Sequence, residues 1–263
     1  MHIFKVLGVS GENPKGCRNS GNAIVKELKN INMSEAGKRI DYGLLDFEEI
    51  HVNNSNLKES DELIEKNSLG TFGNKSKAVF LGGDHSISYP ILKVFLEYSK
   101  KPCLIVFDAH ADLEISSKYP NNKGWLRMII EKGFPVENIL LVGIRNISDK
   151  EFEFIQKHKI KTINMNQLFQ DLEDTCDMIM EFSFGKDLYI SIDMNVIDPA
   201  FVPSVISPEP GGLSSREFLY IIQRLNKLKN FRGIDIVEID LEKDFNKNNL
   251  TVKLAAKILA EVI

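Results

Sequence analysis

Residues 103–112 read Cys-Leu-Ile-Val-Phe-Asp-Ala-His-Ala-Asp, and this stretch decides the fold class. Its first five residues form a short apolar run rich in β-branched and aromatic side chains, which is typical of a strand buried on both faces. The run ends abruptly in Asp108, His110 and Asp112. Residues two apart on an extended segment project to the same side, so these three side chains can converge on one or two cations.

Four further apolar runs of this kind occur along the chain, at 77–81, 139–142, 188–192 and 234–237. The stretches between them have helical spacing, at 22–29, 91–96, 151–157 and 168–182. Strand followed by helix, repeated, predicts a parallel α/β sheet.

The best-marked helix begins at Ser214, whose hydroxyl can cap the first turn while Glu217 reaches back to it. A last helix is expected over 251–263. The polar stretch 53–74 reads as a loop-like surface excursion. Without a linker, repeat or break in composition, a single domain over 1–263 is the economical interpretation.

Composition excludes several classes of protein. With 43% hydrophobic and 27% charged residues, the 263-residue chain is typical of a soluble globular protein. Its 33 basic residues against 37 acidic ones lack the basic excess of nucleic-acid-binding proteins. We expect no membrane partner, because there is neither a signal peptide nor a run of about 18 apolar residues. Three cysteines, far apart, predict a reduced, cytoplasmic setting.

Metal-type ligands follow the other strands as well. His85 comes after the first run, Asp193 and Asn195 after the fourth, and Glu238 after the fifth. In open parallel sheets the carboxyl ends of the strands line the ligand crevice. Carboxylates with imidazole suit a divalent ion, Mn²⁺ first, with Fe, Co, Ni or Zn as alternatives. A pair of such ions, roughly 3.5–4 Å apart, can activate water. Any one of these residues could instead be a cap or turn former, but that interpretation weakens for four clusters together.

Other candidates are weaker. His2 is expected on a flexible terminus, His51 in a polar loop and His158 at a lysine-rich helix end, and all three are expected to be solvated and inert. Cys103 is expected in the core because it lies inside a strand. Trp125 can face the crevice and contact substrate, or it can be a core side chain at a helix start; Arg127 shares the first possibility.

The motifs together closely resemble those of the ureohydrolases, the family of arginases, agmatinases and formiminoglutamases. They span most of the chain from about residue 80: Gly-Gly-Asp-His-Ser (82–86), Asp-Ala-His-Ala-Asp (108–112), Ser-Ile-Asp-Met-Asn-Val-Ile-Asp-Pro (191–199), Pro-Glu-Pro-Gly-Gly-Leu-Ser-Ser-Arg-Glu (208–217) and Asp-Ile-Val-Glu (235–238). The resemblance implies a three-layer α/β/α fold with a central, mostly parallel eight-stranded sheet, and a binuclear manganese centre that hydrolyses guanidino or formimino C–N bonds. It also suggests trimers or hexamers.

By the same resemblance, each ion would have its own ligand set. One set is His85, Asp108, Asp112 and Asp193, and the other is Asp108, His110, Asp193 and position 195. Glu238 would pair with a guanidinium, for which a carboxylate is well suited because it accepts two parallel N–H bonds. Asp112 would also relay a proton to the leaving amine.

Two positions depart from the family pattern. Asn195 replaces an aspartate ligand of the second ion, so we expect a weakened second site or a single-ion enzyme. Lys123 stands near the position of a loop histidine that arginases and agmatinases use; it could contact an anionic group of the substrate or be solvated. The expected activity is agmatinase-like release of urea and an amine. The alternatives are a formiminoglutamase-like hydrolase or a degenerate member that binds metal or a guanidino ligand without turnover.

Overall fold

The computed structural model describes residues 1–10, 15–73, 77–115 and 119–263. In these residues one sheet of eight strands is present, with the order β2-β1-β3-β8-β7-β4-β5-β6, and every neighbouring pair is parallel. The strands are β1 (His2–Val6), β2 (Asp46–Ile50), β3 (Ala78–Leu81), β4 (Pro102–Phe107), β5 (Ile139–Ile144), β6 (Lys161–Asn164), β7 (Asp187–Asp193) and β8 (Phe231–Val237).

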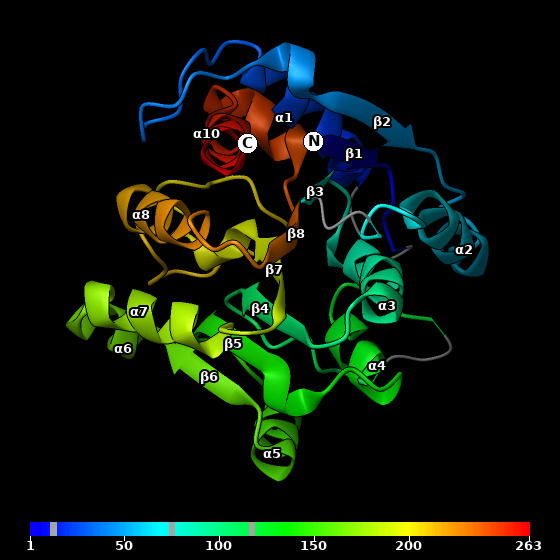
Figure 1. Cartoon of the computed structure of the whole chain (residues 1–263), viewed down its shortest axis with the longest axis vertical. Helices are drawn as coiled ribbons and strands as arrows, with labels where there is room; N and C mark the ends of the chain where they lie inside the picture. Colours follow the sequence, from blue (N-terminus) through cyan, green and yellow to red (C-terminus); the bar gives the residue numbers. More distant parts are fainter. Residues whose placement is uncertain (11–14, 74–76, 116–118) are drawn as a thin grey trace.

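Helices cover both faces of this sheet, which gives the expected three layers (Figure 1). One face packs against α1 (Ser20–Leu28), α6 (Met165–Gln170), α7 (Leu172–Phe182), α8 (Ser215–Leu225) and α10 (Leu250–Val262). The other packs against α2 (Leu57–Ser68), α3 (Ser88–Tyr98), α4 (Trp125–Glu131) and α5 (Asp149–His158). The short α9 (Leu241–Asp244) precedes α10. The α/β/α prediction is therefore confirmed. No described helix has the length and apolar character needed to cross a bilayer.

Four of the predicted strands are confirmed as β4, β5, β7 and β8 with extensions of one to three residues, β3 begins one residue later than predicted, and Ser214 caps α8 as expected. Its side chain accepts a hydrogen bond from the backbone N–H of Glu217, and the Glu217 carboxylate accepts one from the backbone N–H of Ser214. Cys103 lies in the core, where it is fully buried.

Two local predictions are wrong. The stretch 53–74 contains a helix, α2, which packs beside α3. Its buried face is made of Ser60, Ile64 and Ser68, so the apolar stripe expected of a buried helix is missing from the sequence. The single helix expected over 168–182 is divided into α6 and α7. Asp171 has an extended backbone and caps α7 by accepting a hydrogen bond from Asp174 N at 2.9 Å.

Candidate metal centre and cavity

The four strands that carry the candidate ligands are neighbours in the sheet. The order β3-β8-β7-β4 brings together the carboxyl ends that precede His85, Glu238, Asp193 and Asp108. Segments far apart in the sequence therefore meet at one edge. This is the crevice position that an open parallel sheet offers to a ligand.

Gly83 shapes the turn that delivers His85. Its φ is +74°, and a Cβ atom there would lie 2.1 Å from the carbonyl oxygen of Gly8, so a side chain is excluded. The following residue, Asp84, caps a short 3₁₀ helix (His85–Ile87) by accepting a hydrogen bond from Ser86 N at 3.1 Å. The His85 backbone N–H in turn donates to Glu238 Oε1 at 2.7 Å.

The hydrogen bonds behind the His85 ring fix its tautomer. Ser191 Oγ donates to the Asp235 carboxylate at 2.7 Å, so it must accept the 2.8 Å hydrogen bond that joins it to His85 Nε2. Nε2 therefore carries the proton and Nδ1 of the neutral ring presents a lone pair. This arrangement, in which an outer hydrogen bond orients the ring, is typical of metal-binding histidines.

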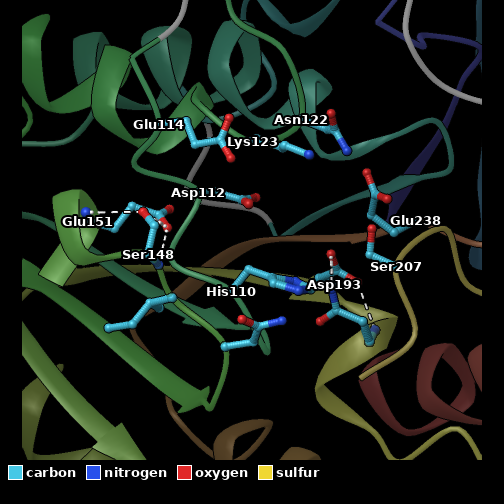
Figure 2. Close-up of a pocket in the computed structure, with 13 residues that line it drawn as sticks. His110, Asp112, Glu114, Asn122, Lys123, Ser148, Glu151, Asp193, Ser207 and Glu238 are labelled. Carbon is cyan, nitrogen blue, oxygen red and sulfur yellow. Dashed lines mark hydrogen bonds between the residues drawn. The ribbon is translucent and has the colours of Figure 1, made fainter. Parts of the chain in front are cut away.

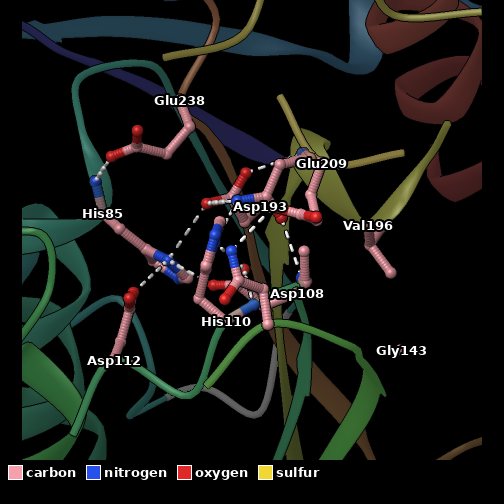
Figure 3. A network of polar contacts seen from close by, with 12 residues as sticks. His85, Asp108, His110, Asp112, Gly143, Asp193, Val196, Glu209 and Glu238 are labelled. Carbon is pink, nitrogen blue, oxygen red and sulfur yellow. Dashed lines mark hydrogen bonds and ion pairs between the residues drawn. The ribbon is translucent and has the colours of Figure 1, made fainter. Parts of the chain in front are cut away.

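Three carboxylates face that lone pair (Figure 3). His85 Nδ1 lies 2.9 Å from Asp112 Oδ2, 3.2 Å from Asp108 Oδ2 and 3.7 Å from Asp193 Oδ2. Within the described residues, His85 Nδ1 and Asp108 Oδ2 are buried without a hydrogen-bond partner. A lone pair directed at carboxylate oxygens is unfavourable unless a cation or a proton lies between them. The donor set, oxygen with one imidazole, therefore fits a divalent ion of the manganese type.

The pKa directions reflect the same crowding. Burial opposes the charged ring of His85, but Asp108 and Asp112 outweigh it and hold its pKa well above the usual value. Burial and the Asp108 charge raise the pKa of Asp112 to about 6. Burial and neighbouring carboxylates also raise the pKa of Asp193 and of Glu238. Three acids of the cluster thus resist ionisation, whereas at Asp108 burial is outweighed by the neighbouring His110 and His85, which lower its pKa to about 2.

Asp112 and Glu238 adopt left-handed backbone conformations, with φ of 51° and 71°. Such conformations are uncommon for non-glycine residues and cost of order 1–3 kcal/mol each when strongly strained. Their occurrence at two of the predicted catalytic positions is typical of functional sites, where surrounding contacts hold the backbone against this cost.

A cavity of about 310 Å³ opens above the cluster (Figure 2). Five carboxylates and one lysine are among the side chains that line it. The full lining is His110, Asp112, Glu114, Asn122, Lys123, Asn146, Ile147, Ser148, Glu151, Asp193, Asn195, Ser207 and Glu238. In the view of Figure 2, Glu114 and Lys123 lie on the opposite side of the cavity from Asp193. The cavity therefore joins the candidate metal ligands to a polar, mainly acidic outer part.

The structure separates Trp125 and Arg127 from the cavity. Trp125 is fully buried, and its indole N–H donates to Asp112 Oδ2 at 2.7 Å. It is thus a core side chain behind a candidate ligand, the second of the two predicted possibilities. Arg127 pairs instead with Glu131 on the same helix. Lys123, in contrast, lines the cavity.

The three histidines expected to be inert lie away from the cavity. His2 contacts Asp46, and His51 contacts Glu49. The His158 ring lies against Phe154 at a tilt of 31°, with ring centroids 4.2 Å apart. His2 belongs to β1 and not to a loose terminus, so its predicted setting is wrong although its exposure is as expected.

The sequence analysis missed the residues that support the site. Ser191 and Asp235 are polar residues inside apolar strands, and that pattern is the signal that could have identified them. Arg145 was also missed. Its guanidinium donates to the backbone carbonyls of Gly143, Val196 and Pro210, and it also joins Asn195 to Glu209 through their backbone oxygens.

The fold and the cluster define a class of parallel α/β proteins with a candidate metal centre at the carboxyl edge of the sheet. The chain belongs to the arginase family, whose model matches residues 6–263. It is 34% identical to arginase 1, mitochondrial, of Arabidopsis thaliana over 71% of this chain and 54% of that protein, so it spans about half the length of this relative.

Two further similarities belong to proteins of other names. N(1)-aminopropylagmatine ureohydrolase of Thermus thermophilus is 30% identical over 75% of this chain and 66% of its own length. The crystal structure of formimidoylglutamase from Bacillus subtilis superposes with a TM-score of 0.91 and 25% identity, over 99% of this chain and 84% of that one. The names of these relatives indicate different substrates.

Proposed function

We propose that this protein is a metal-dependent hydrolase that cleaves the C–N bond of a guanidino compound with a cationic tail, of the agmatine type, and releases urea and an amine. The observation that carries the proposal is the acidic cavity above the ligand cluster. Asp112 and Asp193 belong to the metal ligands and Glu151 is engaged in capping α5, so Glu238 and Glu114 are the lining carboxylates left for the substrate, and they favour positive charge at both of its ends. The membership of the arginase family supports the reaction type.

Glu238 is the residue that we assign to the guanidinium. It is buried, lines the cavity, and has one carboxylate oxygen fixed by the backbone N–H of His85 at 2.7 Å. A fixed carboxylate can accept N–H bonds from a planar guanidinium and neutralise its charge. That contact orients the substrate carbon toward Asp112 and Asp193, the carboxylates on the floor of the cavity.

The metal would be held by His85, Asp108, Asp112 and Asp193. A divalent cation, with Mn²⁺ as our first choice, supplies an activated water nucleophile at neutral pH. We assign Asp112 to pass a proton to the leaving amine, because its carboxylate belongs both to the ligand cluster and to the cavity lining.

The outer part of the cavity decides between substrates. Glu114 favours a cationic tail there, and we assign it to the distal amine. Glu151 does not compete for this role, since its carboxylate accepts hydrogen bonds from Leu113 N and from Ser148 N and Oγ. Lys123 favours the second candidate, a formimino amino acid, because a lysine in the cavity can bind a carboxylate.

The test compares agmatine with 4-guanidinobutyrate, which share the guanidine and differ in tail charge. Urea release by the Mn²⁺-loaded protein is measured for both and for arginine, and formamide release is measured for formiminoglutamate. We expect agmatine to exceed guanidinobutyrate by roughly tenfold in kcat/KM, the effect of about 1.4 kcal/mol from one charge contact. Glu114→Gln should reduce that ratio, and Lys123→Gln should not.

Two results would contradict the proposal. Faster formamide release from formiminoglutamate than urea release from any guanidine would make the second candidate the activity. Binding of agmatine without any product, in protein that contains its metal, would identify a ligand-binding member of the family. Glu238→Gln is the internal control, since it should abolish turnover without removing the bound metal.

A further inference from the structure

The two halves of the ligand cluster differ in how their hydrogen bonds are satisfied. In the half around His85 Nδ1, that nitrogen and Asp108 Oδ2 are buried and have no hydrogen-bond partner among the described residues. In the other half, where the resemblance places a second ion, Asp108 Oδ1, His110 Nδ1 and Asp193 Oδ2 each accept a hydrogen bond from the protein itself (Figure 3). The two halves are therefore not equivalent sites.

Asn195 is the centre of the second half. Its side chain is buried, and its Oδ1 accepts a hydrogen bond from the backbone N–H of Ala109 at 2.9 Å. A backbone N–H can only donate, so the amide oxygen must face Ala109 and the NH₂ group must face the cluster. That NH₂ donates to Asp193 Oδ2 at 2.8 Å and to His110 Nδ1 at 3.0 Å.

The remaining ligand atoms of this half accept backbone donors. Asp108 Oδ1 accepts from the N–H of His110 at 2.8 Å, and Asp193 Oδ1 accepts from the N–H of Asn195 at 2.7 Å. The Asn195 amide would have to turn for its oxygen to face a cation in this half. Turning it would leave the Ala109 N–H buried and unpaired and would remove both donors from Asp193 and His110, which is unfavourable.

We propose that the centre binds one divalent ion, at His85, Asp108, Asp112 and Asp193, and that the Asn195 NH₂ group takes the place of the second ion by hydrogen-bonding Asp193 and His110. This inference deepens the proposed function, because it specifies the metal requirement of the same site. An aspartate at position 195 has no N–H to donate there and brings a further negative charge, so it would restore a ligand for a second cation.

The experiment counts metal rather than product. Metal-free protein is incubated with excess Mn²⁺, freed of unbound ion by gel filtration, and analysed by mass spectrometry of the metal together with calorimetric titration. We expect one ion per chain for the natural sequence and two for Asn195→Asp. The matched control is Asn122→Asp, which adds the same charge to the cavity lining outside the cluster and should keep one ion.

A second pair of variants tests the inference if Asn195→Asp fails to fold. His110→Ala should keep one ion with an affinity within about threefold of the natural protein, because its Nδ1 already accepts from Asn195; His85→Ala should lose the ion. The only tryptophan of the chain, Trp125, has its ring centroid 4.5 Å from that of His85 and gives an independent measurement. Its fluorescence should change up to one equivalent of Mn²⁺ and no further.

Each outcome bears on the inference separately from the activity. Two ions in the natural protein, no ion at all, or loss of the ion in His110→Ala would overturn it. So would a single ion in correctly folded Asn195→Asp. One ion without turnover of any guanidine would leave the inference standing and refute the proposed function, whereas two ions with turnover would do the reverse.

Discussion

The indole N–H of Trp125 donates a hydrogen bond of 2.7 Å to Asp112 Oδ2, the same oxygen that lies 2.9 Å from His85 Nδ1. The indole ring also lies against the His85 ring, with centroids 4.5 Å apart and the ring planes tilted by 39°. One buried side chain thus orients two candidate ligands. Because Asp112 has a left-handed backbone, this contact also helps to hold its carboxylate in place.

Replacing Trp125 by Phe removes this donor while it keeps an aromatic ring. We expect Mn²⁺ affinity to fall by roughly 10- to 100-fold, the usual effect of losing an outer hydrogen bond to a metal ligand. Calorimetric titration of metal-free protein measures it. Phe134→Leu, in the same apolar layer, is the control and should lower stability without changing affinity. Equal Mn²⁺ affinity in Trp125→Phe and the natural protein would show that the hydrogen bond has no orienting role.

Variants of two serines can distinguish the orientation of the His85 ring from the hydrogen bonding of the Asp235 carboxylate. Ser191 joins both residues, whereas Ser88 donates only to Asp235, at 2.9 Å. Ser191→Ala should therefore lower Mn²⁺ affinity by roughly tenfold or more, because Nε2 loses its acceptor and the ring its fixed tautomer. Ser88→Ala should leave the affinity nearly unchanged. If both variants weaken binding equally, the buried Asp235 carboxylate and not the tautomer controls the site.

Arg145 connects the loop after β7 to the loop that carries Glu209 and Pro210. Its guanidinium donates to Asn195 O at 2.6 Å and to Glu209 O at 2.7 Å, and also to three further backbone oxygens. Lysine cannot reproduce this fork of donors. Arg145→Lys should lower the free energy of unfolding in urea by roughly 2–4 kcal/mol, since several buried carbonyls lose charged partners.

The matched control for Arg145 is Arg127→Lys, where the only hydrogen bond to a described residue is with Glu131, one turn along α4. That pair is partly exposed, so its loss should change the free energy of unfolding by about 0.5 kcal/mol or less. A similarly small effect for Arg145→Lys would mean that the two loops are held by other contacts, such as the hydrogen bond from Asn146 to Glu209.

The parts of the fold that could be predicted are those determined by interactions between residues close together in the sequence. The capping box at Ser214 requires only two residues three apart, and the central strands are apolar on both faces because both faces are covered. Strands β2 and β6, at the two edges of the sheet, and β1, beside β2, were not predicted. The edge strands are mostly exposed or half-buried and carry polar residues, and Lys5 interrupts the apolar residues of β1, so none of the three forms a continuous apolar run.

The candidate site, too, could be predicted only in part. The sequence shows which residues follow each strand, and parallel pairing of the strands then brings His85, Asp108 and Glu238 together. The orientation of the Asn195 amide depends on the backbone N–H of Ala109, which comes from another strand end and is brought near only by the pairing of β4 with β7. Nor could the sequence decide whether Trp125 faces the cavity or the core, because the first residue of a helix that follows a loop can be directed to either.

Asp61 on α2 gives the protein a pH dependence outside the site. Burial first, and then the charge of Glu65, raise its pKa to about 7, against an ordinary value of 3.8. The folded state therefore keeps this proton to a higher pH than the unfolded state, so stability falls as pH rises from about 4 to 7 and stays level above it. Asp61→Asn cannot lose a proton, and its advantage in urea unfolding over the natural protein should grow by roughly 1–2 kcal/mol between pH 5 and pH 8. Glu97→Gln, which removes an exposed carboxylate from the neighbouring α3, should show no such growth. A difference between Asp61→Asn and the natural protein that is constant with pH would mean that Asp61 is ionised in the folded state throughout this range.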